Sequence, residues 1–218
     1  MRIDIEGTDG AGKTTGLKYL IDLLQQEHKK SVLETREVGN PHIPICVELR
    51  KTILNPDSNL SGEAMELIFS AMRLENDRFY KKVGELNDFI VSDRGWLSHL
   101  AYTDHNVSPE FTEKLYFKFL ENETSLPDVV VYFDVDEQTA LTRRTRRGEE
   151  ADVIELKGVP FQQKVRRSFE DYLEMYDTMG EIKVIRVDAN QDLENVKGQL
   201  AAIARQLVDM KEELQWKK

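Results

Sequence analysis

The sequence predicts a three-layer α/β fold, in which a five-stranded parallel sheet is flanked by helices on both faces. Short β-branched stretches alternate with longer amphipathic ones, which is the pattern of strands joined by crossover helices. Residues 129–133 are apolar at every position, as expected of a strand buried on both faces. The five predicted strands are residues 2–6, 31–34, 88–92, 129–135 and 183–187.

The composition predicts one cytoplasmic domain. The 218 residues suffice for one well-buried α/β domain but are few for two, so we expect a single domain over residues 1–218. Cys46 is the only cysteine, which excludes an intramolecular disulfide, and no run of about 18 apolar residues could span a membrane. The chain begins with a predicted strand rather than the apolar core of a signal peptide.

The charge pattern argues against a nucleic-acid or membrane partner. The chain is 32% charged with a net charge of −10, and its basic residues form no long block that could follow a phosphate backbone. Apolar residues recur at helical spacing over residues 193–214, which predicts a helix packed on the core rather than on a membrane. We therefore expect a small-molecule partner.

A phosphate-binding loop directly follows the first predicted strand. Residues 7–15 read GTDGAGKTT and satisfy the pattern G-x-x-x-x-G-K-[ST]. In such a loop, backbone N–H groups bind phosphate oxygens, Lys13 reaches the β- and γ-phosphates, and the Thr14 hydroxyl is placed to bind Mg²⁺. A helix should begin here and direct its positive end at the anion. The predicted ATP-binding residues of the loop are Gly7, Asp9, Gly10, Ala11, Gly12, Lys13, Thr14 and Thr15.

Charged residues follow the second and third predicted strands. Arg36 and Glu37 come after the second, and Asp93 and Arg94 come after the third. The carboxyl ends of parallel strands form the ligand-binding edge of such sheets. An acidic residue at this edge beside a phosphate loop commonly holds Mg²⁺, so Asp93 is the leading candidate for a metal ligand or base. The alternative is a local surface ion pair between Asp93 and Arg94.

Four arginines in five residues follow the fourth strand: Arg143, Arg144, Arg146 and Arg147. Phosphoryl transfer spreads negative charge over the moving group, and arginines on a closing segment stabilise that charge while excluding water. We therefore expect a lid over residues 143–158. The alternative is an exposed helix with ion pairs to acidic neighbours such as Glu149.

Together these segments resemble the thymidylate kinase family of nucleoside-monophosphate kinases over nearly the whole chain. The phosphate loop is similar to the family's, including Asp9, an acidic position that the family uses to bind the 3′-hydroxyl of the acceptor sugar. Residues 35–39 resemble its Thr-Arg-Glu-Pro-Gly segment, residues 67–73 its base-binding helix, and residues 93–102 its Asp-Arg-Tyr signature. The resemblance implies a P-loop NTPase fold with an arginine-rich lid, and it implies ATP and Mg²⁺ as cofactors.

The resemblance also implies a substrate site. Its residues would be Asp9, Arg36, Phe69, Arg73, Arg94, Ser98 and Tyr102, while Asn190 and Gln191 would surround the adenine of ATP. In the family, the two arginines at positions 36 and 94 hold the acceptor phosphate, and Tyr102 disfavours a ribose 2′-hydroxyl. Phe69 and Arg73 are four residues apart, which on a helix lets the ring stack on a pyrimidine while the guanidinium donates to its carbonyl. The alternative for Phe69 is an ordinary core aromatic.

The phosphate loop indicates where the catalytic charge comes from. Some family members carry an arginine in this loop, whereas position 10 here is glycine. The lid should therefore supply the charge, with Arg146 and Arg147 as leading candidates and Arg143 in reserve. The other predicted catalytic residues are Lys13, Asp93 and Arg94, and the carboxylates of Glu6 and Glu37 are expected to surround the water ligands of the metal.

Three departures from the family pattern bear on specificity. Val38 replaces the family's proline, so any cis-proline turn there should be lost. Gly95 and Trp96 stand where the signature has its tyrosine, and residues 152–155 lack an arginine that usually follows the lid's aspartate. A reshaped pocket could accept 5-hydroxymethyl-dUMP or several deoxynucleoside monophosphates.

The reaction implied is in-line transfer of the ATP γ-phosphoryl to the 5′-phosphate of a deoxypyrimidine monophosphate, with dTMP the first candidate. The family resemblance also implies a homodimer, and apolar faces within residues 63–80 and 111–120 would permit one, although both could be core. The alternatives are a nucleoside kinase, a P-loop ATPase switch protein, and a kinase for modified pyrimidines within DNA.

Overall fold

A computed structural model of the chain shows a parallel five-stranded sheet in the order β2-β3-β1-β4-β5. The structure describes residues 1–103, 107–108, 110–111, 113–114, 126–147, 158–180 and 182–216. The strands are β1 (Arg2–Glu6), β2 (Val32–Arg36), β3 (Phe89–Asp93), β4 (Val129–Asp134) and β5 (Lys183–Asp188). The predicted fold class is therefore confirmed, and all five predicted strands are present, the first with the predicted ends and the others with ends shifted by at most two residues.

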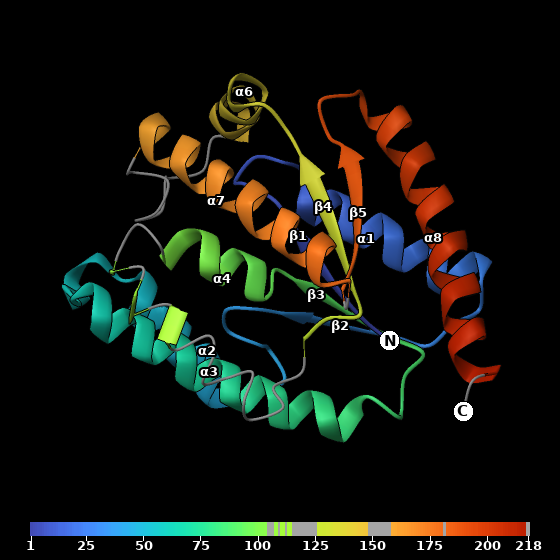
Figure 1. The fold of residues 1–218 in the computed structure, drawn as a ribbon, viewed down its shortest axis with the longest axis horizontal. Coiled ribbons are helices and arrows are strands. Elements are labelled where there is room, and N and C mark those ends of the chain that lie inside the picture. Colours follow the sequence, from blue (N-terminus) through green and yellow to red (C-terminus); the bar gives the residue numbers. More distant parts are fainter. Residues whose placement is uncertain are drawn as a thin grey trace.

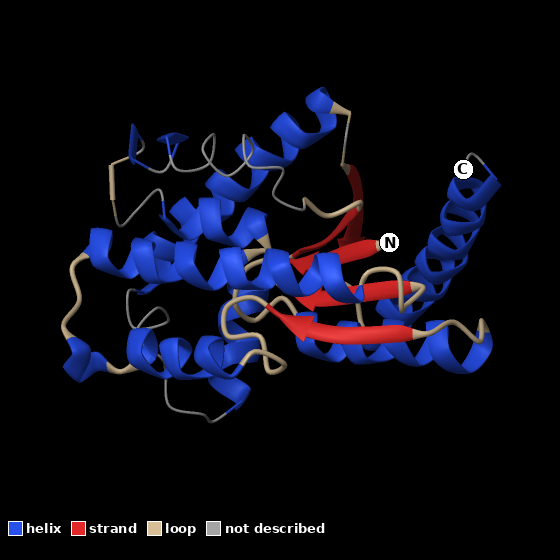
Figure 2. Cartoon of the chain, turned by 90° about the horizontal axis from the view of Figure 1, so that it is seen from below, coloured by secondary structure: helices blue, strands red, loops and turns tan. Residues whose placement is uncertain are grey.

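Helices cover both faces of this sheet. The described helices are α1 (Lys13–Asp22), the π-helical turn η1 (Leu23–Glu27), α2 (Pro44–Leu54), the short 3₁₀ helix η2 (Pro56–Ser58), α3 (Gly62–Val83), α4 (Trp96–Thr103), α6 (Glu137–Arg147), α7 (Gly158–Met179) and α8 (Leu193–Trp216). Helices α1 and α8 lie on one face, and α4 and α7 lie on the other (Figure 1). The strands lie between these layers, and their arrowheads point in the same general direction (Figure 2). Among the described residues, no helix is both long and apolar enough to cross a bilayer.

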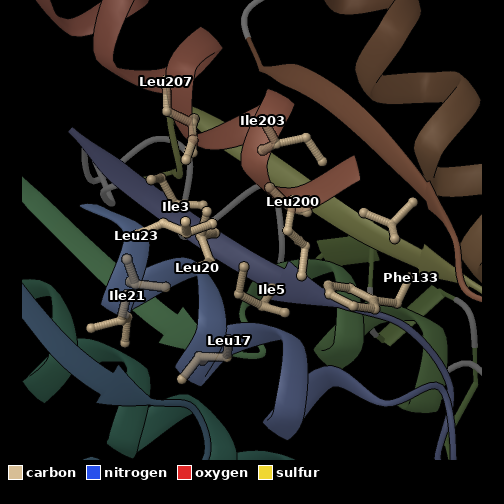
Figure 3. Packing of buried hydrophobic residues seen from close by; sticks show 14 of the residues in the cluster. Ile3, Ile5, Leu17, Leu20, Ile21, Leu23, Phe133, Leu200, Ile203 and Leu207 are labelled. Atoms are coloured by element: carbon tan, nitrogen blue, oxygen red, sulfur yellow. The ribbon is translucent and has the colours of Figure 1, made fainter. Parts of the chain in front are cut away.

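The larger core lies between the sheet and helices α1 and α8. Figure 3 shows Leu17 and Leu20 of α1, and Leu200 of α8, converging on Ile3 and Ile5 of β1. The predicted core stripe of the last helix is therefore largely confirmed. The prediction is wrong at its first position, because Leu193, the first residue of α8, has a side chain that is 52% exposed.

Strand β1 buries charged side chains on its other face. Its residues alternate between isoleucines, which join the α1–α8 core, and Arg2, Asp4 and Glu6, none of which is more than 7% exposed. The guanidinium of Arg2 donates to both Asp4 oxygens at 2.9 and 3.0 Å, and to Glu37 Oε1 at 3.0 Å. Arg2 thus faces two opposite charges, which compensates for burying these groups in the protein interior.

Helix α3 completes this charged layer. Arg73 donates to the second Glu37 oxygen, and the Tyr80 hydroxyl donates to the first at 3.2 Å. Burial works against the charge of Arg2, but the carboxylates of Asp4 and Glu37 raise its pKa above the ordinary value. Burial raises the pKa of Asp4 to about 7. The network joins β1 to the residue after β2 and to α3.

Removing Arg2 should therefore be costly. At pH 8, where Asp4 is mostly ionised, Arg2→Met leaves its carboxylates without their main counter-charge and should lower the free energy of unfolding by about 3–5 kcal/mol. Urea denaturation followed by circular dichroism measures this loss. The matched control is Arg186→Met, which breaks an exposed pair with Glu170 and should cost at most about 1 kcal/mol. Equal losses for the two variants would contradict the importance of the network.

Candidate active site

A cavity of about 630 Å³ lies between the phosphate loop, helix α3 and the segment leading from β3 into α4. The predicted site residues that line it are Asp9, Gly10, Gly12, Lys13, Thr14, Thr15, Phe69, Arg73, Asp93, Arg94, Ser98 and Tyr102. The structure thus brings together predicted residues from three separate parts of the chain. The other predicted residues whose side chains are described do not line it: Gly7, Ala11, Arg36, Arg143, Arg146, Asn190 and Gln191.

The phosphate loop has the backbone that its glycines predict. Gly12 precedes α1 with φ 90°, and Gly10 has φ 88° with its Cα so near Ala140 that a Cβ would lie 2.5 Å from the Ala140 carbonyl oxygen. Only glycine fits such a position without strain. Helix α1 begins at Lys13, as predicted, so its N-terminus faces the cavity.

Lys13 is buried at the head of α1. Its ammonium donates to the carbonyl oxygens of Gly7 at 2.9 Å and Thr8 at 2.8 Å. Burial, followed by the nearby positive charge of Arg94, lowers the pKa of Lys13 to about 8. A bound triphosphate would add negative charge beside this ammonium and favour its protonated form.

Arg94 and Asp9 form the centre of the cavity wall. Arg94 donates to Asp9, to the Ser98 hydroxyl at 2.9 Å and to the Gly7 carbonyl at 3.2 Å, and the Tyr102 hydroxyl donates to Asp9 at 2.9 Å. Burial opposes the charge on Asp9, but Arg94 and Lys13 hold its pKa below the usual value. Arg94 has φ 69°, which is uncommon for a residue other than glycine and frequent in functional sites.

Glu6 orients the helix that carries this wall. One of its oxygens accepts from the backbone N–H groups of Gly95 at 2.8 Å and Ser98 at 3.0 Å, and the other accepts from the Ser98 hydroxyl. A carboxylate in this position neutralises the N-terminal end of α4. Glu6 thus binds α4, and Glu37 binds Arg2, Arg73 and Tyr80. The expectation that these two carboxylates surround the metal's water ligands stays a prediction.

The far end of the cavity holds Phe69 and Arg73 on one face of α3, as predicted. Arg73 donates to Glu37 and to the Gly95 carbonyl at 3.1 Å, and its guanidinium lies 4.5 Å from the centre of the Trp96 ring. Within the part of the chain that the structure describes, the Arg73 Nε atom has no hydrogen-bond partner.

Two buried cavity residues were missed by the sequence reasoning. Glu66 and His99 line this end of the cavity, with Glu66 Oε1 and His99 Nε2 2.6 Å apart. The His99 ring packs edge-on against Phe69 at 6.0 Å and Trp96 at 5.3 Å between ring centres. Glu66 lies three residues before Phe69 in the predicted helix, which was the one signal that could have indicated it.

The departures at positions 38 and 95 have structural explanations. A Cβ on Gly95 would lie 1.8 Å from Asp4 Oδ2, so the buried Asp4 carboxylate occupies the space that a side chain at position 95 would need. The predicted loss of a cis turn is wrong, because the Glu37–Val38 peptide bond is cis although residue 38 is valine. Arg50, also missed, donates to the Val38 carbonyl at 2.8 Å and lines the cavity.

Among the predicted site residues outside the cavity, the arginines of β2 and α6 are described only in part. Arg36 ends β2 with an exposed side chain. Arg144, which the sequence reasoning did not select, donates to the Asp9 carbonyl at 2.8 Å, whereas Arg143 donates to the Gln191 carbonyl at 3.4 Å. Arg146 is exposed at the end of α6. The side chain of Arg147 and the rest of the predicted lid up to residue 157 lie outside the described residues.

The loop after β5 is placed by its own hydrogen bonds. Asn190 accepts from the Asp136 N–H at 2.9 Å, and Gln191 donates to Asp188 at 2.8 Å. Both residues therefore lie at the carboxyl edge of the sheet beside α6, outside the cavity.

Comparison with known proteins agrees with this geometry. The family model for thymidylate kinase matches residues 5–200. The chain belongs to the thymidylate kinase family. A thymidylate kinase of Enterococcus faecalis is 31% identical over 198 residues, covering 89% of this chain and 90% of the relative. Thymidylate kinases of Pediococcus pentosaceus and Halalkalibacterium halodurans are 28% and 29% identical, each covering 95% of this chain and 98% and 97% of the relative.

The closeness of position 95 to Asp4 predicts that this chain cannot carry a side chain at position 95. Asp4 is buried and bound by Arg2, so it cannot move aside. Gly95→Ala should therefore lower the free energy of unfolding by about 3 kcal/mol. The matched control is Gly198→Ala in α8, where the added methyl group meets no atom within 4 Å and should stabilise by about 0.5–1 kcal/mol. A thermal unfolding midpoint for Gly95→Ala at or above that of the unchanged protein would contradict the steric account.

The buried ammonium of Lys13 predicts how ATP affinity depends on pH. The free protein loses this charge as the pH rises through about 8, whereas bound phosphates keep it protonated. The dissociation constant for ATP should therefore rise about tenfold per pH unit above pH 8, with one proton taken up on binding. Calorimetric titrations between about pH 7 and pH 9 measure both quantities. Lys13→Arg stays charged, so its affinity should not change over this range; a flat profile for the unchanged protein would contradict the assignment.

Proposed function

We propose that this protein is an ATP-dependent kinase that transfers the γ-phosphoryl group of ATP to the 5′-phosphate of dTMP, giving dTDP and ADP. One observation carries the proposal. In a chain of the thymidylate kinase family, a single cavity holds a phosphate loop at one end and the pair Phe69 and Arg73 at the other. A P-loop switch protein would not need the Phe69 and Arg73 end of the cavity. Membership of the thymidylate kinase family argues against the alternative of a nucleoside kinase.

The residues that line the cavity have separate roles in the proposed phosphoryl transfer. The amides of the phosphate loop and Lys13 hold the phosphates of ATP. Arg94, with Ser98 beside it, binds the acceptor phosphate, and Asp9 and Tyr102 face the deoxyribose. Arg36 is a further candidate for the acceptor phosphate. Catalysis is then positioning and charge neutralisation, because an in-line transfer needs no covalent intermediate.

Residues outside the cavity complete the proposed site. Arg146 and Arg147, with Arg143 in reserve, would approach the transferred group when residues 143–158 close as a lid. Asn190 and Gln191 would contact the adenine, because they lie at the carboxyl edge of the sheet beside α6. Arg144 already holds the loop at the Asp9 carbonyl, so its substitution would move the loop itself.

The donor set at the phosphate loop suits Mg²⁺. The described residues contain no group of three His, Cys, Asp or Glu side chains that could enclose a metal. Mg²⁺ in nucleotide sites is usually held by one or two protein oxygens together with phosphates and water, and Thr14 and Asp93 both line the cavity. The Thr14 hydroxyl and the Asp93 carboxylate would hold the ion, which neutralises phosphate charge when bound.

The proposal extends to the number of domains, the cellular location and the oligomeric state of the protein. Residues 1–218 would form one domain, working in the cytoplasm as a homodimer. Leu67 and Leu74 are seven residues apart on α3, and their side chains are 57% and 50% exposed, which leaves an apolar strip for a second copy. Most of residues 111–120, the other predicted dimer face, lies outside the described residues.

An acceptor panel tests the proposed function. ADP production from ATP and Mg²⁺ should be fastest with dTMP, slower with dUMP, 5-hydroxymethyl-dUMP and dCMP, and near background with UMP, dGMP, thymidine or no acceptor. Phe69→Ala should lower kcat/KM for dTMP about tenfold to a hundredfold, because stacking on the base is lost. Phe79→Ala, on the same helix and stacked on His42, serves as the control. ATP hydrolysis that is independent of every acceptor would contradict the proposal.

A further inference from the structure

A small cavity of about 10 Å³ lies behind the phosphate loop, between the loop, α6 and α7. Thr8 lines it from the loop, Ala140 and Arg144 line it from α6, and Gln162 and Arg166 line it from α7. It shares no lining residue with the active-site cavity. A space of this size admits about one water molecule.

Gln162 is a polar residue on a helix face that is otherwise apolar. The same face of α7 continues through Val165, Phe169 and Leu173, which are buried in the core between α7 and the sheet. Gln162 is only 4% exposed, and among the described residues neither its Nε2 nor its Oε1 has a hydrogen-bond partner. Because a buried amide without hydrogen bonds is costly, its position indicates a partner within the small cavity.

Arg166 has an unpaired donor one helical turn further along α7. Its Nη2 donates to Asp134 at 3.1 Å, and its Nη1 lies 3.6 Å from a carboxylate oxygen of Glu137. Its buried Nε has no partner within the part of the chain that the structure describes. An acceptor on Gln162 and a donor on Arg166 therefore lie on the same side of one helix without bonding each other directly, which is the arrangement that a bridging water completes.

The chemistry of these atoms identifies the ligand as water. The amide of Gln162 needs both an acceptor and a donor, and Nε of Arg166 needs an acceptor. An anion could not donate to Gln162 Oε1, and a metal cation would face the guanidinium groups of Arg144 and Arg166. A water molecule provides both functions in the available volume, and a buried water makes about three hydrogen bonds to groups of this kind.

We propose that this cavity binds one water molecule, which joins Gln162 and Arg166 of α7 to the phosphate loop at Thr8. The Thr8 carbonyl accepts from the Lys13 ammonium at 2.8 Å, so the water supports the part of the loop that holds the phosphate-binding lysine. Gln162 is a positioning residue, because it acts on the loop through the water and contacts neither nucleotide.

Helix α6 holds the same loop without a water. Arg144 donates to the Asp9 carbonyl at 2.8 Å, and the Ala140 carbonyl lies against Gly10. Helices α6 and α7 precede and follow residues 148–157 in the chain. Both helices are then fixed to the phosphate loop, α6 directly and α7 through the water. The effect on catalysis rests on the proposed function, whereas the water site does not.

A crystal structure of the free protein tests the water site without any measurement of activity. One ordered water should lie about 2.7–3.2 Å from the Gln162 amide and from Arg166 Nε. Gln162→Met has an unbranched side chain of similar length without the amide, and it should lose this water. The matched control is Gln163→Met at the neighbouring exposed position, which should keep it. The absence of an ordered water in the unchanged protein, or a Gln162 amide bonded directly to protein groups, would overturn the proposal.

Kinetics test what the water does for the phosphate loop. In Gln162→Met, kcat for ADP production with dTMP should fall about threefold to tenfold, because the loop is less well positioned. The dissociation constant for dTMP should change less than about twofold, and Gln163→Met should leave both quantities unchanged. If Gln162→Met does not fold, Gln162→Leu replaces it. An unchanged kcat in a folded variant that has lost the water, or weaker dTMP binding with an unchanged kcat, would overturn the positioning role.

The outcomes separate this inference from the proposed function. If the unchanged protein phosphorylates no acceptor, the proposed function fails, and the crystal structure alone decides whether the water site exists. If dTMP is phosphorylated but the cavity holds no ordered water, only the inference fails.

Discussion

The buried guanidinium of Arg2 is the interaction on which the arrangement of this protein depends. It lies between Asp4 on its own strand and Glu37, which follows β2 on the far side of β3, and Glu37 is bound in turn by Arg73 of helix α3. Each of these charges would be too costly to bury alone. Because they neutralise one another only in this arrangement, the position of α3 against the sheet follows from the central strand.

The same strand orients both ends of the active-site cavity. Its last residue, Glu6, binds the start of α4, which carries Ser98, His99 and Tyr102 into the cavity. The phosphate loop continues directly from Glu6. The groups that would bind ATP and those that would bind the acceptor nucleotide are therefore both anchored to strand β1. Phosphoryl transfer needs such rigidity, because most of its acceleration comes from holding two phosphates in line.

Some parts of the site could be predicted from the sequence because they depend on local spacing. The phosphate loop needs its glycines and Lys13 at fixed intervals, and Phe69 and Arg73 share a helix face because they are four residues apart. Glu66 and His99 could not be found in this way, since they come from different helices and only packing makes them neighbours. Arg50 and Arg144 were missed for the same reason: each binds a carbonyl of a sequence-distant loop.

The sequence by itself determined the strands, their parallel arrangement, the phosphate loop and the family, because each is written in residue order and period. The alternation of charge and isoleucine in residues 2–6 would equally suit a strand with one face in water. Only the tertiary structure decided that this charged face is buried, that Asp4 fills the space beside Gly95, and that His99 meets Glu66. These outcomes depend on charges and side-chain volumes that come into contact only in the folded chain. The order of residues in the sequence does not give the spatial distance between side chains that are far apart along the chain.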